Sequence, residues 1–141
     1  MDLTAAAAGL NQGFTGGMGA QFGDITGDGA TMTVPITPAL HQPYGIVHGG
    51  VYCTIAETLA SVAGAIWFGD RGKVVGVSNH TNFLRATRAG TLHAVATPIH
   101  RGRSQQLWLV EIADDEGRAV ARGEVRLANL PATESGTGPG I

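Results

Sequence analysis

Residues 41–69, HQPYGIVHGGVYCTIAETLASVAGAIWFG, decide the fold of this chain. From about His48 the run predicts one helix of about 20 residues, about 30 Å long at 1.5 Å per residue, and Gly69 and Gly72 end it. The helix is apolar nearly all round, so it cannot lie on an open surface with one face in water. Other elements must wrap it, and the single carboxylate in its middle, Glu57, calls for an explanation.

The runs that flank this helix are typical of strands. Residues 18–25 and 30–37 lie on either side of the turn sequence TGDG and predict a hairpin, while the glycine-rich residues 11–17, NQGFTGG, predict a break in any helix before it. Four strand-like runs follow the helix, at residues 73–86, 91–102, 104–115 and 118–130. Their separators have the length of hairpin turns, so these four strands are expected to form an antiparallel meander.

The expected fold class is therefore α+β: a curved antiparallel sheet wrapped around one long central helix. The chain of 141 residues is long enough for one domain with its own core. We expect residues 1–130 to form that single domain. Residues 131–141, PATESGTGPGI, have the composition of a disordered tail.

Composition excludes several classes of function. A net charge of −2 argues against a general nucleic-acid binder, which needs a surplus of Lys and Arg. The one cysteine, Cys53, excludes an internal disulfide and suits a reducing cytoplasm, and the N-terminus has no basic segment typical of a secretory signal. Residues 49–68 are long enough to span a membrane, but Glu57 at their centre would cost at least a few kcal/mol in lipid. We expect a cytoplasmic protein without membrane insertion.

Polar residues gather around the carboxylate of this helix. Ser61 lies four residues after Glu57 on the same helical face, His48 marks the helix start, and Gln42 lies in the loop before it. At the start, Gly49 and Gly50 leave backbone N–H groups uncovered beside the positive end of the helix dipole.

Such N–H groups bind partial negative charge. A carbonyl oxygen held there, facing a carboxylate that attacks it or activates water, gives the chemistry of acyl transfer to water.

Basic residues are concentrated after the helix. Between residues 71 and 110 the chain has six basic residues and no acid, namely Arg71, Lys73, Arg85, Arg88, Arg101 and Arg103. This separation suggests a phosphate site centred on HRGRS, residues 100–104, although ordinary solvated turn charges explain it equally well. A phosphate site beside an acyl-hydrolysing carboxylate indicates a thioester of coenzyme A as substrate.

Residues 41–65, 73–90 and 100–118 together resemble the hotdog-fold acyl-CoA thioesterases of the phenylacetate-degradation type. The resemblance covers about residues 30–130, and its most specific part is the pattern Q-x5-HGG-x6-E-x3-[ST]. It is closest to the branch of the Arthrobacter-type 4-hydroxybenzoyl-CoA thioesterase and the 1,4-dihydroxy-2-naphthoyl-CoA hydrolases. In the latter a His commonly follows the asparagine that matches Asn82, whereas this chain has Phe83.

The resemblance implies roles for individual residues. Glu57 would be the nucleophile or general base, the Gly49 N–H the oxyanion donor, and Gln42 the amide near the thioester carbonyl. His48 would support the loop–helix junction and Ser61 would help to position water. The expected contacts to the substrate or to coenzyme A come from Gly50, Asn82, Phe83, Arg85, Arg101, Arg103 and Ser104.

The family builds its site across a homodimer, and dimers commonly pair into homotetramers. The expected function is hydrolysis of an acyl-CoA thioester, with an aromatic acyl group, to the free acid and CoA. The alternatives are a medium-chain or broad-range acyl-CoA thioesterase, a non-catalytic acyl-CoA-binding protein and a hotdog dehydratase. No metal or other cofactor is expected, because the five histidines show no HExxH or comparable ligand spacing.

Overall fold

The computed structural model describes residues 9–10 and 12–133. Its one sheet has six antiparallel strands, in the order β1-β2-β4-β5-β6-β3. The strands are β1 (Gln21–Thr26), β2 (Gly29–Pro35), β3 (Gly72–Phe83), β4 (Thr91–Arg101), β5 (Gln105–Ala113) and β6 (Ala119–Pro131). The helical segments are α2 (Gly13–Gly17), α3 (Gly49–Phe68) and the short 3-10 turns η1 (Pro38–Leu40) and η2 (Gly69–Arg71).

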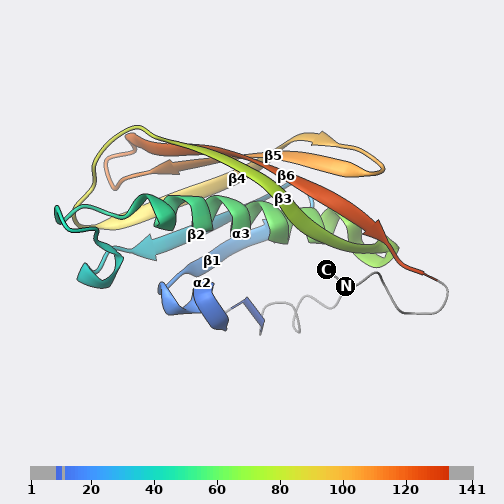
Figure 1. Ribbon diagram of the computed structural model, residues 1–141, viewed down its shortest axis with the longest axis horizontal. Helices are drawn as coiled ribbons and strands as arrows, with labels where there is room; N and C mark the ends of the chain where they lie inside the picture. The colour runs from blue at the N-terminus through green and yellow to red at the C-terminus, as the bar shows by residue number, and fades with distance from the viewer. Residues whose placement is uncertain (1–8, 11, 134–141) are drawn as a thin grey trace.

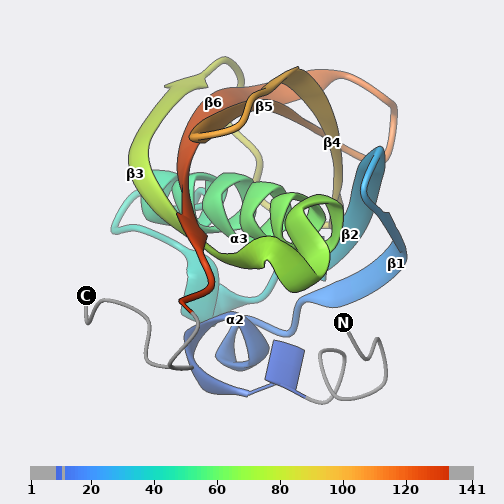
Figure 2. The same ribbon diagram turned by 90° about the vertical axis from the view of Figure 1, so that its right-hand side faces the viewer.

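The sheet curves strongly around α3, and α2 lies on the side of α3 that the sheet leaves open (Figures 1 and 2). The expected α+β arrangement, a curved antiparallel sheet around one long helix, is therefore confirmed. Residues 49–71 are apolar and long enough to cross a membrane by length and composition, but in this fold they contain the core helix.

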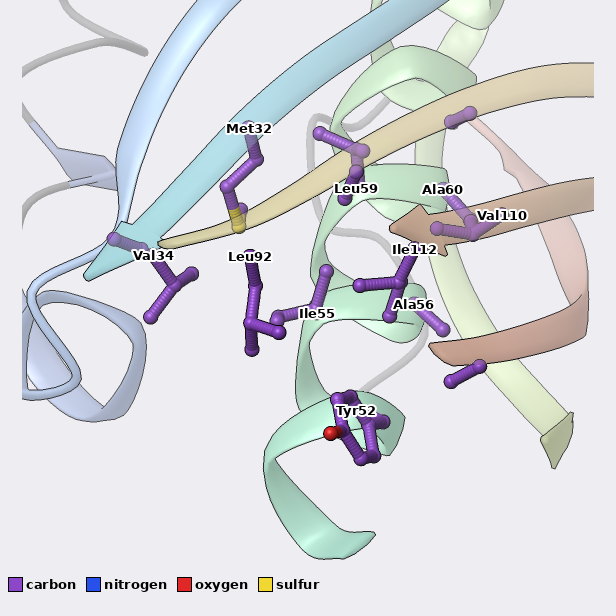
Figure 3. Packing of buried hydrophobic residues seen from close by; sticks show 14 of the residues in the cluster. Met32, Val34, Tyr52, Ile55, Ala56, Leu59, Ala60, Leu92, Val110 and Ile112 are labelled. Atoms are coloured by element: carbon purple, nitrogen blue, oxygen red, sulfur yellow. The ribbon is translucent and has the colours of Figure 1, made fainter. Parts of the chain in front are cut away.

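The helix α3 has residues suited to both of its ends and to its contact with the sheet. His48 is the N-cap, and Gly69 ends the helix with a φ of 60°, which a glycine adopts without strain. The buried face of α3 consists of Val51, Tyr52, Ile55, Ala56, Leu59, Ala60, Ala63, Gly64 and Phe68. Figure 3 shows Ile55, Ala56, Leu59 and Ala60 packed near Leu92, Val110 and Ile112 of the sheet.

Small residues on this face let the sheet close tightly on the helix. A Cβ on Gly64 would stand 2.3 Å from Leu127 Cδ1 and 2.7 Å from the side-chain oxygen of Gln106. Gln106 is fully buried; its amide donates to the Gly64 carbonyl at 3.2 Å and its oxygen accepts from Trp108 Nε1 at 2.7 Å. The polar atoms of Gln106 are thus paired, as burial requires.

The meander expected for the last four strands is wrong for the first of them. β4, β5 and β6 do form consecutive antiparallel pairs, but β3 pairs with β6 instead of β4. β4 pairs with β2 on its other side, so it has no free edge for β3. Residues 84–90 therefore cross from one edge of the sheet to its interior, past the N-terminal end of α3 (Figure 1).

Two further expectations concern the ends of the chain. The break predicted within residues 11–17 occurs at Gln12, whose backbone is extended, but Gly13–Gly17 then form a further helix, α2, which contacts α3 through the hydroxyls of Thr15 and Thr58 at 3.2 Å. Tertiary contact here overrides weak helix propensity. β6 extends to Pro131, and the Ala132 N–H donates to the Arg71 carbonyl at 2.8 Å. Residues 134–141 of the expected tail lie outside the described residues.

Candidate functional site

A cavity of about 290 Å³ lies at the N-terminal end of α3. It brings together four of the residues singled out in the sequence. Its lining residues are Gln42, Ile46, Val47, Gly49, Tyr52, Phe83, Leu84, Arg85 and Ala86. The loop before α3, the first turn of α3 and the crossover after β3 therefore meet at one place.

The Gly49 N–H is a free hydrogen-bond donor in this cavity. The Nδ1 atom of His48 accepts from the Gly50 N–H at 2.8 Å, and the His48 carbonyl accepts from the Val51 N–H at 2.9 Å. Within residues 9–10 and 12–133, the Gly49 N–H meets no acceptor. Such a donor at a helix start suits an oxygen atom that carries partial negative charge.

At position 49 a side chain could be added only if its neighbour from β3, Phe83, moved. A Cβ there would stand 2.6 Å from two carbon atoms of the Phe83 ring. Phe83 also packs on Tyr52, with ring centroids 5.8 Å apart. Phe83 thus forms one wall of the cavity beside Gly49, although 57% of its surface stays exposed.

The Gln42 side chain is oriented by its own loop. Its oxygen accepts from the Tyr44 N–H, and its backbone N–H donates to the Ile46 carbonyl at 2.8 Å. Because the oxygen is engaged, the Nε2 group is the part of the amide that remains available as a donor. Two residues that line the cavity therefore carry an available donor, the Gly49 N–H and the Gln42 amide.

Glu57 lies on the exposed side of α3, toward the edge strand β3. A Cβ on Gly76 would stand 3.5 Å from its Cδ and Oε1 atoms, an ordinary contact distance, so the carboxylate lies directly beside β3. The register of β3 against β6 shifts between Gly76 and Ser78, which makes an irregularity at Val77. Irregularities of this kind are common beside active sites.

The Glu57 carboxylate has no hydrogen bond or ion pair with the described part of the chain. Glu57 stands eight residues after Gly49, about 12 Å along the axis of an α-helix, and it does not line the cavity. One chain therefore does not bring Glu57 to the Gly49 donor. Ser61, half-buried on the following turn, stays near Glu57 and away from the cavity as well.

The edge strand β3 is fixed to α3 beside Glu57. The Asn79 amide donates to the Cys53 carbonyl at 2.9 Å, and the Thr81 hydroxyl donates to the Asn79 side-chain oxygen at 2.7 Å. Asn79, Thr81 and Phe83 thus face the helix. Asn82 alternates with them, so it lies on the opposite face of β3 from the cavity.

The basic residues divide between the two ends of α3. Arg85 lines the cavity at the N-terminal end, whereas Arg101 stacks over Trp67 near the C-terminal end, at 5.7 Å from the ring centroid. Arg101 also donates to the Gly27 carbonyl at 2.6 Å and to the Asp28 carboxylate at 2.8 Å, so its charge is paired.

The exposed Arg103 and Ser104 follow in the β4–β5 turn, which lies at the far end of the molecule from the crossover after β3 (Figure 1). The Asn129 amide holds this turn, because it donates to the Gly102 and Arg103 carbonyls at 2.9 and 3.2 Å. Within one chain, Arg103 and Ser104 do not reach the cavity at Gly49.

Two residues near the candidate donors were given no role in the sequence analysis: Tyr52, which lines the cavity, and Arg88, which contacts the loop that carries Gln42. Arg88 donates to the Tyr44 carbonyl at 3.1 Å, and its own carbonyl accepts from His41 Nε2 at 2.8 Å, so it fixes the loop that carries Gln42. Tyr52 is 3% exposed. The only signal for Tyr52 was its place one turn after Gly49, and Arg88 was visible only as one of six basic residues.

Burial raises the pKa of the Tyr52 hydroxyl, and the nearby Thr87 hydroxyl acts in the opposite direction. Neither hydroxyl oxygen has a hydrogen-bond partner of normal geometry among the described residues. Because the net effect raises this pKa, Tyr52 stays a neutral phenol at physiological pH. The described residues also contain no cluster of three or more His, Cys, Asp or Glu side chains that could hold a metal ion.

Comparison with known proteins gives a family for this arrangement. The sequence profile of the thioesterase superfamily matches residues 44–121. A Mycobacterium tuberculosis protein classed as an esterase is 49% identical over 122 residues, which cover 84% of this chain and 87% of that protein. Its solved structure superposes with a TM-score of 0.82 over 84% of this chain and 96% of that chain.

Two further relatives carry more specific names. The 1,4-dihydroxy-2-naphthoyl-CoA hydrolase of Escherichia coli is 34% identical over 110 residues, 78% of this chain and 81% of that protein. The structure of a Haemophilus influenzae thioesterase is 29% identical, with a TM-score of 0.87 over 95% of this chain and 94% of that chain. The fold shared with these structures is the hotdog fold that the sequence predicts.

Proposed function

The chain belongs to the thioesterase superfamily, and from that premise we propose that it hydrolyses the thioester of an aromatic acyl-CoA. Its relatives and its fold make it a thioester hydrolase at the level of the family. The observation that carries the proposal is the pair of free donors, the Gly49 N–H and the Gln42 amide, in one cavity. Both donate to the thioester carbonyl oxygen and stabilise the negative charge that it gains.

Glu57 supplies the reacting carboxylate. In one route it attacks the carbonyl carbon, expels the CoA thiolate and leaves a mixed anhydride that water hydrolyses. In the other it takes a proton from a water molecule, whose oxygen attacks the carbonyl carbon before the thiolate leaves. Both routes end in the free acid and CoA, and both need only water and residues of the protein, without a cofactor.

The active unit in this proposal is a homodimer. Glu57 and the Gly49 donor lie about two turns of helix apart in one chain, so the carboxylate that reacts at Gly49 comes from a second copy. The strand β3 offers the edge for this pairing, because it has 12 residues, pairs only with β6 and exposes 57% of Val77. A long free edge strand readily pairs with another chain. A homotetramer of two such dimers extends the proposal.

The aromatic acyl group is supported by two observations. The E. coli relative is named for a bicyclic aromatic acyl-CoA, and the motif with Gln42 and Glu57 resembles the aromatic-acyl branch of the family. Arg85, an exposed residue that lines the cavity, is the basic residue of this chain best placed to meet the phosphates of coenzyme A. Arg103 and Ser104 reach them only from the second copy.

The substitution Glu57→Ala tests the proposal. We expect kcat for benzoyl-CoA or 2-naphthoyl-CoA, followed by thiol release, to fall by at least about 100-fold, the usual contribution of a general base. The matched control is Glu111→Ala, which removes an exposed acid of β5 outside the cavity. A Glu57→Ala protein that is folded and keeps near-normal kcat would overturn the role of Glu57. A single turnover of the wild-type protein in oxygen-18 water then distinguishes the anhydride route from the general-base route, because only the anhydride route can place the label in the Glu57 carboxylate.

A further inference from the structure

Two buried amide side chains lie at one end of the sheet, at positions where the strand pattern favours apolar residues. Asn129 follows Val125 and Leu127 on the inward face of β6, and Gln106 precedes Trp108 on the inward face of β5. Asn129 is 6% exposed and Gln106 is fully buried. Apolar side chains of similar shape at both positions would stabilise the core equally well or better. The two amides therefore need a reason other than packing.

Asn129 holds the β4–β5 turn by three successive carbonyl groups. Its Nδ2 group donates to the Gly102 and Arg103 carbonyls at 2.9 and 3.2 Å. Its backbone N–H donates to the Ser104 carbonyl at 3.0 Å. Within the turn, the Gly102 N–H donates to the Gln105 carbonyl at 2.9 Å. The backbone of residues 102–104 is therefore fixed by a residue that belongs to another strand.

The Asn129 side chain is itself held in place by Gln106. The Gln106 Nε2 group donates to the Asn129 Oδ1 atom at 2.8 Å and to the Gly64 carbonyl of α3 at 3.2 Å. Because the Asn129 oxygen is engaged by Gln106, the Asn129 Nδ2 group is directed to the turn. Two paired amides thus join the core helix to the β4–β5 turn, and a fully paired buried network makes the groups that it connects more rigid.

The outer side of this turn carries side chains that suit an anion. Arg103 and Ser104 are exposed, and neither side chain has a hydrogen bond or ion pair within the described part of the chain. A guanidinium and a hydroxyl both donate to phosphate oxygens. Binding a phosphate with a mobile turn costs the entropy of ordering that turn, whereas a turn that is already fixed avoids most of this cost.

We infer that Asn129 is a positioning residue for coenzyme A. It fixes the β4–β5 turn in the shape in which Arg103 and Ser104 of one copy meet the phosphate groups of a substrate bound at the Gly49 cavity of the other copy. This inference rests on the proposed function, in which the turn reaches the substrate from the second copy. Asn129 is buried and acts only through the turn, which accounts for an amide on an otherwise apolar face of β6.

The substitution Asn129→Leu tests the inference, because it removes the donor to the turn and keeps a side chain of similar size. Gln106 keeps the Gly64 carbonyl as an acceptor, so we expect the variant to fold, as circular dichroism will show. We expect KM for benzoyl-CoA to rise about tenfold, the usual effect of losing one hydrogen bond to a charged group, with little change in kcat. The benzoyl thioester of N-acetylcysteamine has no phosphate, so its kcat/KM should stay unchanged. A merely structural role of Asn129 would affect both substrates alike.

The matched control is Gln105→Leu, which also replaces an amide beside the turn. The Gln105 side chain accepts from Arg126 and does not hold the turn, so this variant should keep both kinetic constants for both substrates. A second control combines Arg103→Ala with Ser104→Ala, which should itself raise KM for benzoyl-CoA. In that background Asn129→Leu should have little further effect, because residues that act as a unit are not additive.

Calorimetric binding of CoA gives a readout that does not depend on turnover. We expect Kd for CoA to rise in Asn129→Leu and to stay unchanged in Gln105→Leu. Unchanged KM and Kd in Asn129→Leu, equal losses for both thioesters, or additive losses in the Arg103→Ala and Ser104→Ala background would overturn the inference. If the wild type releases no CoA from either thioester, the proposed function fails instead, and the Kd values for CoA still test the role of Asn129.

Discussion

At the residue scale, two glycines and one free carboxylate explain how the site can form. Gly49 lies against the Phe83 ring, where a Cβ would come within 2.6 Å of two ring carbons, and Gly76 lies beside the Glu57 carboxylate, where a Cβ would make an ordinary contact at 3.5 Å. Glu57 is left with no partner in the described part of its own chain. An exposed carboxylate without an ion-pair partner contributes little to stability, which is consistent with the catalytic role proposed for Glu57.

Tyr52→Phe is expected to raise the free energy of unfolding. The Tyr52 hydroxyl is buried without a partner of normal geometry among the described residues, and such a group costs about 1 to 3 kcal/mol. We therefore expect a gain of about 1 kcal/mol in urea unfolding at fixed protein concentration. Thr87→Val is the companion variant, since it removes the neighbouring hydroxyl. A loss of stability in Tyr52→Phe would show that the hydroxyl is hydrogen-bonded after all.

Asp114 is expected to make stability depend on pH. Burial alone raises the pKa of its carboxyl, but hydrogen bonds from the Arg118 N–H, the Arg118 guanidinium and the Glu116 N–H outweigh burial and hold this pKa below its ordinary value. A group with a lowered pKa in the folded state stabilises the fold above its unfolded pKa, about 3.9 for Asp. That contribution is lost as the pH falls below about 4.

The measurement for Asp114 compares wild type with Asp114→Asn in urea unfolding between pH 7 and pH 3. The wild type should have the higher free energy of unfolding, and its advantage over Asp114→Asn should be largest at pH 5 to 7 and shrink toward pH 3. Asp24→Asn, at an exposed carboxylate on β1, serves as the control. A difference that stays constant across this range contradicts the assignment.

At the element scale, the start of α3 supplies the Gly49 N–H, and two loops orient the other donor, the Gln42 amide. The loop before α3 carries Gln42, and the crossover of residues 84–90 holds this loop in place. The Arg88 guanidinium donates to the carbonyls of Tyr44 and Gly45 at 3.1 and 3.4 Å. The Val47 N–H donates to the Thr87 carbonyl at 2.9 Å. Because β3 pairs with β6, the crossover must pass this end of the helix.

Arg88→Ala is expected to lower kcat about tenfold, which corresponds to a loss of about 1.4 kcal/mol of transition-state stabilisation. The change in KM is expected to be smaller. The loop then loses the guanidinium that fixes Gln42. In a Gln42→Ala background the same substitution should have little further effect, because residues that act as a unit are not additive. Arg122→Ala, which removes an exposed guanidinium of β6, is the control. Additive losses would mean that Arg88 acts on the reaction independently of Gln42.

At the scale of the whole molecule, the sheet closes around three sides of α3 and leaves one end strand, β3, beside the Glu57 carboxylate (Figure 2). The free edge, the register irregularity at Val77 and Glu57 lie together. The donors and the carboxylate are separated along the helix within one chain. Assembly of two copies is therefore part of the proposed chemistry and not only a source of stability.

Mixed dimers are expected to recover activity that neither parent has. Glu57→Ala and Gln42→Ala proteins should each be nearly inactive when alone. In a dimer of one chain of each, one site combines both defects and the other combines an intact Glu57 with an intact Gln42. The two variants are co-expressed with different affinity tags, and the doubly tagged dimer is purified and assayed. If the sites are shared, this dimer should have about half of the wild-type kcat per dimer. Recovery of no activity would place Glu57 and Gln42 in the same chain's site.

The sequence by itself determined the helix, its ends at His48 and Gly69, and the need to wrap it. These follow from local periodicity and from capping residues, which act over a few positions. It also pointed to Glu57 and Gly49, and the resemblance assigned their roles, which stay predictions. The tertiary structure decided that β3 joins β6 and that residues 13–17 form α2 against α3. It also separated Glu57 from the donors at Gly49 and Gln42. Those features depend on contacts between residues far apart in the chain, whose energies no local pattern contains.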